Sequence, residues 1–127
     1  MSTHAVLGVQ FDDGEILGCY VHFDGYTLGE RLTHYLKTHT TTDLTLLITE
    51  AQSSGGMRSF HCPPYDPIRR EDIEGPAVTE FLDDNVPYII TAQNWEDDHM
   101  GSYYRYLVNY ESGTFYTIDR GKKWPVD

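Results

Sequence analysis

The chain has very little cysteine, with only Cys19 and Cys62 among its 127 residues. Two thiols are too few to hold a disulfide-rich fold, so the domain must depend on an apolar core. A zinc site could combine these cysteines with His22 and His61. The spacing argues against it, because Cys19 and His22 point to opposite faces of a strand and no paired C-x-x-C spacing is present. We therefore expect free thiols, no metal ion and no cofactor.

Long apolar runs are also missing. No segment approaches the roughly 18 to 20 apolar residues needed to span a bilayer. The first ten residues contain neither a basic stretch nor a long apolar stretch, so they do not resemble a secretory signal peptide. Hydrophobic residues make up 39% of the chain and charged residues 23%, which is typical of a folded globular domain. These properties predict a single domain over residues 1–127, located in the cytoplasm.

Positive charge is scarce, because 9 Lys and Arg stand against 20 Asp and Glu and give a net charge of -11. The imbalance is greatest over residues 71–98, which contain no Lys or Arg. The acidic residues of this segment are Glu71, Asp72, Glu74, Glu80, Asp83, Asp84, Glu96, Asp97 and Asp98. Such a segment repels nucleic acid and membrane surfaces and attracts basic protein surfaces. The alternative is that the charge only keeps the protein soluble.

Trp95 directly precedes three of these acidic residues. An indole in an acidic loop suits an anchor that faces a partner protein. It could equally close the apolar core of the domain. We include Trp95 with the acidic residues as the candidate partner-binding surface.

The N-terminal part predicts a β-hairpin over residues 4–11 and 16–23. Both stretches are apolar and β-prone, and Asp13-Gly14 between them is a strong type I′ turn signal. A two-residue loop at these positions would place Ala5 opposite His22. Both faces of the hairpin are largely apolar, so we expect helices to cover at least one of them.

Two helices are predicted after the hairpin. Thr27 and Glu30 have the spacing of a capping box, and apolar residues then recur at helical intervals. Asp43 is a candidate cap for a second helix, although residues 44–49 are also compatible with a strand. A third, short helix is predicted over residues 77–84.

The C-terminal part predicts strands again. Residues 86–92 form one expected strand, and residues 103–110 and 114–119 form a hairpin through a Gly-containing loop. The predicted order is β-β-α-α-β-β-β. It indicates an α+β fold with a mostly antiparallel sheet of about five strands and two to three short helices packed on one face.

Polar residues gather where the second expected strand ends. His22 and Asp24 would project to the same face of an extended strand, where a carboxylate can orient an imidazole for acid–base catalysis. The sequence contains no G-x-S-x-G, H-E-x-x-H or P-loop motif. A turn at residues 24–25 with a local hydrogen bond from His22 is the better supported interpretation.

A nucleotide ligand would need cationic side chains beside aromatic rings. Tyrosines near the same strand end could stack on a base, and nearby arginines could pair with phosphate. The candidate ligand-binding residues are Tyr20, His22, Asp24, Tyr26, Arg58, Tyr103 and Arg105. Backbone N–H groups of residues 53–56, Ser-Ser-Gly-Gly, could also hold a phosphate. A flexible loop is the better supported interpretation of that segment, because no P-loop lysine accompanies it.

Residues 20–26 resemble a segment of a family of small uncharacterised proteins from phages and prophages. In that family an initial hairpin is followed by Tyr-x-His-Trp-Asp-Gly-Tyr-Pro and a helix. Five residues of this chain match the pattern: Tyr20, His22, Asp24, Gly25 and Tyr26. Phe23 stands in place of the Trp, and Thr27 stands in place of the Pro. The resemblance covers about a tenth of the chain and implies a phage origin, without an activity.

These observations lead to three hypotheses. The first is a non-enzymatic phage-type binding protein that inhibits a host defence component, with its acidic surface on a basic, nucleic-acid-binding partner. The second is a module that sequesters a small nucleotide signal, and the third is a small hydrolase built on His22 and Asp24. No direct binding to nucleic acid or membrane is expected. A homodimer is predicted through the uncharged, tyrosine-rich face of the last hairpin.

Overall fold

The computed structural model describes residues 4–23, 27–84, 86–93, 95, 104–119 and 122–126, with side chains only up to residue 115. Its elements are β1 (Ala5–Gln10), β2 (Ile16–Val21), α1 (Leu28–Thr38), α2 (Thr41–Ser53), β3 (Met57–His61), β4 (Tyr65–Asp66), β5 (Glu71–Asp72), β6 (Val78–Phe81), β7 (Tyr104–Asn109), β8 (Phe115–Asp119) and β9 (Lys122–Val126).

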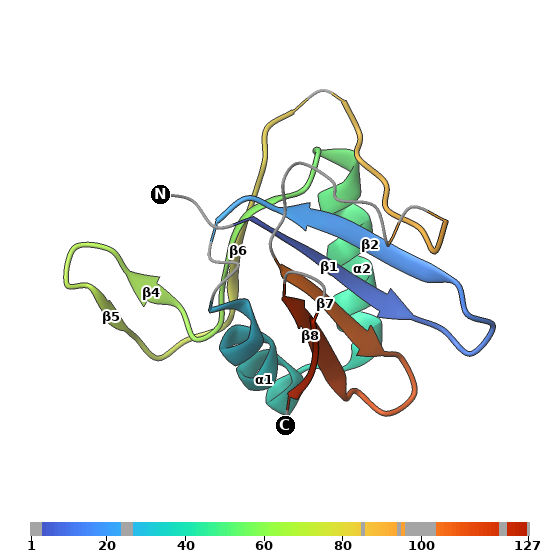
Figure 1. Ribbon diagram of the computed structural model, residues 1–127. Coiled ribbons are helices and arrows are strands. Elements are labelled where there is room, and N and C mark those ends of the chain that lie inside the picture. Colours follow the sequence, from blue (N-terminus) through green and yellow to red (C-terminus); the bar gives the residue numbers. More distant parts are fainter. Residues whose placement is uncertain are drawn as a thin grey trace.

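The fold is α+β, as predicted, with a mostly antiparallel sheet and two helices. The main sheet has the strand order β6-β3-β2-β1-β7-β8-β9, so it is wider than the five strands expected. The β2–β3 and β1–β7 pairs are parallel, and the other four pairs are antiparallel. Strands β4 and β5 form a separate arm that extends away from the sheet (Figure 1).

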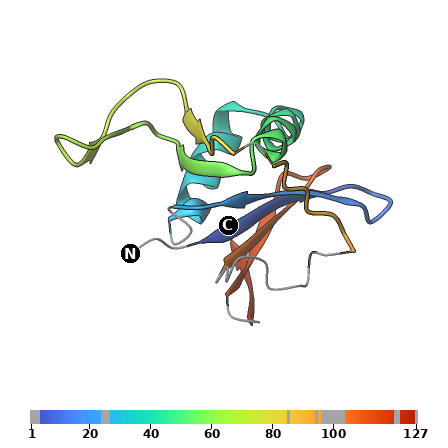
Figure 2. The same ribbon diagram turned by 90° about the horizontal axis from the view of Figure 1, so that it is seen from above.

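Both helices lie on one face of the sheet (Figure 2). Their apolar residues pack with alternate residues of the central strands into one large cluster: Ala5, Leu7, Val9, Cys19, Val21, Leu28, Leu32, Tyr35, Leu44, Ile48, Ala51, Met57, Phe60, Cys62, Tyr106, Val108 and Phe115. We call this side the helix face. On the opposite side, which we call the open face, a smaller cluster contains Val6, Ile16, Ile90, Trp95 and Leu107.

The first hairpin has a three-residue loop, so the predicted register is wrong. The N–H of Phe11 donates to the carbonyl of Glu15, and the N–H of Gly14 donates to the carbonyl of Phe11, both at 2.9 Å. Gly14 has φ of 87°, which fits a type I turn followed by a left-handed glycine. The register moves by one residue, and Ala5 pairs with Val21.

The two helices start differently. Thr40 and Asp43 form a reciprocal capping box at the start of α2, so Asp43 lies in the first turn and the residues after it are helical. At α1, Thr27 is the N-cap residue, but its side chain makes no capping hydrogen bond, so the capping box expected there with Glu30 is not formed. Neither described helix is long and apolar enough to cross a membrane.

Residues 53–56 end α2 in a Schellman motif, which corrects the interpretation as a flexible loop. The N–H of Gly56 donates to the carbonyl of Ala51 at 2.8 Å, and the N–H of Gly55 donates to that of Gln52 at 3.3 Å. Gly55 has φ of 90°, a conformation that favours glycine. Because these N–H groups bond within the chain, they are not available to hold a phosphate.

Two other predictions are wrong. Residues 77–84 contain the strand β6 and no helix, because the segment completes the sheet edge beside β3. Residues 86–92 do not form a strand, and only Ile90 bridges to Gly18. Pro87 lacks the N–H that a ladder requires. The segment instead crosses the open face, where Ile90 packs in the small cluster.

Candidate functional site

Three side chains form a hydrogen-bonded cluster on the open face, where β1 begins and β2 ends. The hydroxyl of Tyr20 lies 2.8 Å from Nδ1 of His4 and 2.7 Å from Nδ1 of His22. Nδ1 of His4 also lies 3.0 Å from the backbone carbonyl oxygen of His22. The two imidazole rings are 4.8 Å apart. Tyr20 is buried and both histidines are half-buried, so the cluster reaches the surface through its imidazoles.

The backbone carbonyl of His22 sets the direction of the hydrogen bonds in this cluster. A carbonyl only accepts, so we assign the hydrogen of neutral His4 to Nδ1, where it is shared between this carbonyl and the hydroxyl oxygen of Tyr20. Tyr20 then has one possible acceptor for its O–H in the cluster, which is Nδ1 of His22. His22 in its neutral form therefore carries its hydrogen on Nε2. The Nδ1 atoms face Tyr20, so the Nε2 atoms of both rings point away from it.

The surroundings of His22 disfavour its charged form. Burial lowers the pKa of His22, and repulsion from His4 and Arg58 lowers it further. Burial also raises the pKa of Tyr20, with a contribution from Tyr88, so its hydroxyl stays protonated near neutral pH. The network is consistent with this, because a second hydrogen on His22 would point at the O–H of Tyr20.

Arg58 and Arg105 frame the cluster on neighbouring strands. Arg58 is the extra residue of a β-bulge in β3, and it is exposed between the buried Met57 and Ser59. Bulges of this kind redirect a side chain out of the regular alternation. Arg105 lies opposite Val6 in the β1–β7 pair, and Val6 lies opposite Tyr20.

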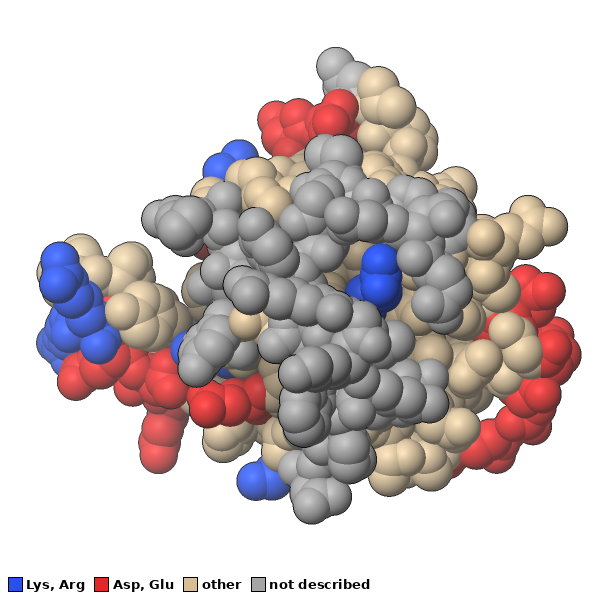
Figure 3. All heavy atoms as spheres, viewed as in Figure 1, with Lys and Arg blue, Asp and Glu red and all other residues tan. Residues whose placement is uncertain are grey.

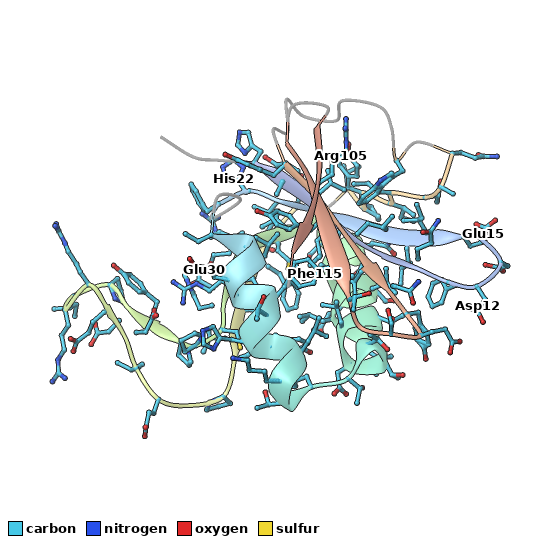
Figure 4. The ribbon with its side chains drawn as sticks, turned by 60° about the horizontal axis from the view of Figure 1, so that its bottom comes forward. Asp12, Glu15, His22, Glu30, Arg105 and Phe115 are labelled. Carbon is cyan, nitrogen blue, oxygen red and sulfur yellow. The ribbon has the colours of Figure 1, made fainter. Side chains whose placement is uncertain are left out.

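Figure 4 shows the side chains of His22 and Arg105 on one side of the sheet, with Glu30 and Phe115 on the other. The structure thus brings together four of the predicted ligand-binding residues: Tyr20, His22, Arg58 and Arg105. Asp24, Tyr26 and Tyr103 lie outside the described residues. The pairing of His22 with Asp24 is therefore not tested, and the described partner of its Nδ1 is Tyr20.

His4, a member of the cluster, and Tyr88, which packs beside it, were not predicted from the sequence. The ring of Tyr88 stacks on that of Tyr20 at 6.2 Å. His4 lies opposite His22 when the observed register is extended by one residue. A three-residue loop at Asp12-Asp13-Gly14 would have given this pairing, so the sequence did contain a signal.

The described carboxylates of the predicted partner surface are exposed and follow the β5–β6 side of the molecule. They are Glu71 and Asp72 on β5, Glu74 in the arm, Glu80 on β6, and Asp83 and Asp84 after β6. Figure 3 shows acidic side chains on the arm and others near the top of the view. Glu96, Asp97 and Asp98 lie outside the described residues.

Arg31 and Asp66 order the arm that carries part of this surface. Nη1 of Arg31 donates to Asp72 at 2.9 Å and to the carbonyl of Pro63 at 3.2 Å, which fixes the base of the arm. At the tip, Oδ1 of Asp66 accepts from the N–H groups of Ile68 and Arg69 at 2.9 and 3.2 Å. The side chain of Ile68 is 92% exposed. The arm is therefore fixed at its base and ordered at its tip, and it protrudes from the sheet.

Trp95 is not a partner-facing anchor. It is only 3% exposed and belongs to the small cluster on the open face. A Cβ atom on Gly8 would lie 2.8 Å from Cζ3 of the indole, so the ring packs directly on the backbone of β1. The absence of a side chain at Gly8 makes this burial possible, and Trp95 closes the core.

The tyrosine-rich face of the last hairpin packs towards the helices. Tyr106 is 3% exposed, and Tyr104 and Tyr110 pack half-buried against the helix-face cluster. The hydroxyl of Tyr110 lies 2.8 Å from that of Thr42. The homodimer stays a prediction, and it would need a surface other than these three tyrosines.

The two cysteines are buried, and burial raises the pKa of each thiol. Cys19 belongs to the helix-face cluster, whereas His22 belongs to the network on the open face. The sheet separates these two side chains, so they cannot share one metal ion.

Comparison with protein-family models, with curated protein sequences and with solved structures gives no match for this chain. The resemblance to phage proteins therefore stays a prediction.

Proposed function

We propose that this chain is a small, non-enzymatic, phage-type binding protein that acts in the cytoplasm of an infected cell. It inhibits a host defence component by occupying a basic surface that otherwise binds nucleic acid. One observation carries the proposal: every described carboxylate between residues 71 and 84 is exposed, on a protruding arm and the adjoining sheet edge. A convex acidic edge is complementary to a basic groove.

Most of these carboxylates form no ion pair with another residue that the structure describes. Asp72 pairs with Arg31 at 2.9 Å, and Glu71 lies 3.9 Å from Arg69. Within the described part of the chain, Glu74, Glu80 and Asp83 have no ion pair or side-chain hydrogen bond. Their charge is therefore available to a partner.

The proposal is tested by removing charge without reversing it. The triple variant Glu74→Gln, Glu80→Gln and Asp83→Asn leaves the described hydrogen bonds intact. A matched control neutralises Asp12, Asp13 and Glu15, which belong to the β1–β2 turn. Figure 4 places Asp12 and Glu15 at the end of the molecule opposite the arm.

The readout is displacement of a fluorescent DNA duplex from a panel of basic DNA-binding host proteins, followed by anisotropy. We expect the unmodified protein to displace DNA from at least one of them, less effectively as salt is added. The edge variant should be weaker by roughly tenfold or more, and the turn variant should be unchanged. The absence of displacement, or equal weakening in both variants, would contradict the proposal.

A further inference from the structure

We propose that the open face holds a second site, which binds a phosphate group that retains an O–H, through His4, His22 and Arg58. The site is separate from the acidic edge and does not depend on it. The ligand class includes inorganic phosphate and phosphate monoesters. It excludes sulfate and phosphate diesters, which have no O–H to donate near neutral pH.

The two imidazoles present different hydrogen-bonding groups on the side away from Tyr20. Nδ1 of His4 carries hydrogen because it lies 3.0 Å from a carbonyl oxygen, so the outward Nε2 of neutral His4 accepts. Nδ1 of His22 accepts from Tyr20, so the outward Nε2 of His22 donates. The rings are 4.8 Å apart, so one acceptor and one donor stand side by side.

The hydrogen-bonding pattern of the two rings matches that of a protonated phosphate. A protonated phosphate has both an O–H, which can donate to His4, and a bare oxygen, which can accept from His22. A metal ion would require two outward lone pairs, and the network leaves only one. The same pattern therefore favours a protonated oxyanion over a bis-histidine metal site.

Arg58 adds a positive charge to the two imidazoles. Arg58 projects from a bulge beside the end of β2, where the N–H of Phe23, the residue after His22, donates to the backbone carbonyl of Arg58 at 2.9 Å. Arg58 has no ion pair within the described part of the chain, so its charge remains available to a ligand. A guanidinium pairs readily with the oxygens of a phosphate group, so Arg58 suits this ligand.

Tyr20 is a positioning residue in this site. It is 2% exposed, and its hydroxyl fixes the orientation of both rings from below. Its own ring is held by the stacked ring of Tyr88. Loss of the hydroxyl should therefore change selectivity between phosphate and sulfate and not only affinity.

The experiment uses the full chain at pH 7.2, where an ordinary histidine is mostly neutral and inorganic phosphate still carries an O–H in a substantial fraction. Ligands are inorganic phosphate, AMP, cyclic AMP and sulfate, each at matched ionic strength. Melting temperature and histidine ring NMR shifts are recorded. A tenfold excess of phosphate over its Kd should raise Tm by about 4 °C, whereas sulfate and cyclic AMP should give no shift.

Variants separate the site from general charge. Arg58→Gln should remove the phosphate response, and the control Arg70→Gln, at an exposed arginine of the arm, should retain it. Tyr20→Phe should reduce the discrimination against sulfate. A higher affinity for AMP than for inorganic phosphate would identify a nucleotide as the natural source, and equal affinity would identify free phosphate.

Three results would overturn the site. These are an equal response to phosphate and sulfate, no response to inorganic phosphate and AMP, or a phosphate response that survives Arg58→Gln. Tight binding of Zn²⁺ that shifts both histidine rings would show that the assigned tautomers are wrong. The DNA-displacement experiment is independent of each of these outcomes, because its variants lie on the acidic edge.

Discussion

The two faces of β1 and β2 come from alternate residues of the same strands, yet they are packed in different ways. On the helix face, Leu7, Val9 and Cys19 are fully buried beneath two helices. On the open face, Val6 lies in a small cluster that Trp95 closes, and beside it Tyr20 binds two histidines. The comparison shows how one hairpin can supply a core to the fold and leave polar groups for binding. Substitutions on the helix face should therefore affect mainly stability, and substitutions in the polar part of the open face should affect mainly binding.

The largest effect should come from the helix face. Phe60 is fully buried in its cluster, and its ring meets that of Tyr35 edge-on at 5.2 Å. Phe60→Ala should lower the free energy of unfolding by about 3–5 kcal/mol, because a cavity replaces the ring. Chemical denaturation measures this. A loss below about 1 kcal/mol would show that the helices are not packed on the sheet as described.

A smaller effect should come from the apolar part of the open face. Gly8→Ala would push against Trp95 and should cost about 1–3 kcal/mol through overpacking. Tryptophan fluorescence during unfolding gives the measurement. Gly29→Ala in α1 is the matched control on the helix face. Its new methyl would lie 3.3 Å from the ring of Tyr106, and the gain in helix propensity offsets this contact, so the change should stay within about 0.5 kcal/mol.

The polar cluster should contribute less again. Tyr20→Phe keeps the buried ring and removes the hydroxyl between the imidazoles, so it should cost about 1 kcal/mol. It should also raise the pKa of His22, because Nδ1 is then free to take up a proton. NMR titration of the histidine rings measures that change. Tyr65→Phe on the arm is the control, and an unchanged His22 pKa in Tyr20→Phe would contradict the hydrogen-bond direction.

The smallest effect should appear as a dependence of stability on pH. The pKa of His22 is lowered in the folded protein, so the unfolded chain binds more protons just below the ordinary histidine value of about 6.5. Stability should therefore fall as pH decreases from about 6.5 towards the folded pKa of His22. His22→Gln should flatten this part of the profile. A profile unchanged by the substitution would show that His22 titrates alike in both states.

Much of the fold was predictable because it follows local patterns. The hairpin strands, the two helices and the final hairpin were all expected from periodicity and turn residues. The wrong predictions depend on tertiary context. Residues 78–81 form a strand because they pair with the edge of β3. The segment after it contains Pro87, which cannot donate to a ladder, and makes only the bridge between Ile90 and Gly18.

The candidate site was predicted in part for the same reason. Tyr20 and His22 were predicted because they lie near each other at the end of one strand. His4 was missed because the predicted two-residue loop shifted the register by one residue and placed Ala5 opposite His22. The role of Trp95 could not be read from its acidic neighbours. It depends on the absence of a side chain at Gly8, which lies far away in the sequence.

The parallel pairing of β1 with β7 has a consequence for how the chain is made. Ala5 pairs with Tyr104 and Gln10 with Asn109, so the middle of the sheet closes only after β7 has left the ribosome. Until then one edge of an apolar strand stays unpaired, and contacts of such long sequence separation form slowly. We expect folding to finish after translation, with the nascent hairpin as the segment that chaperones must protect.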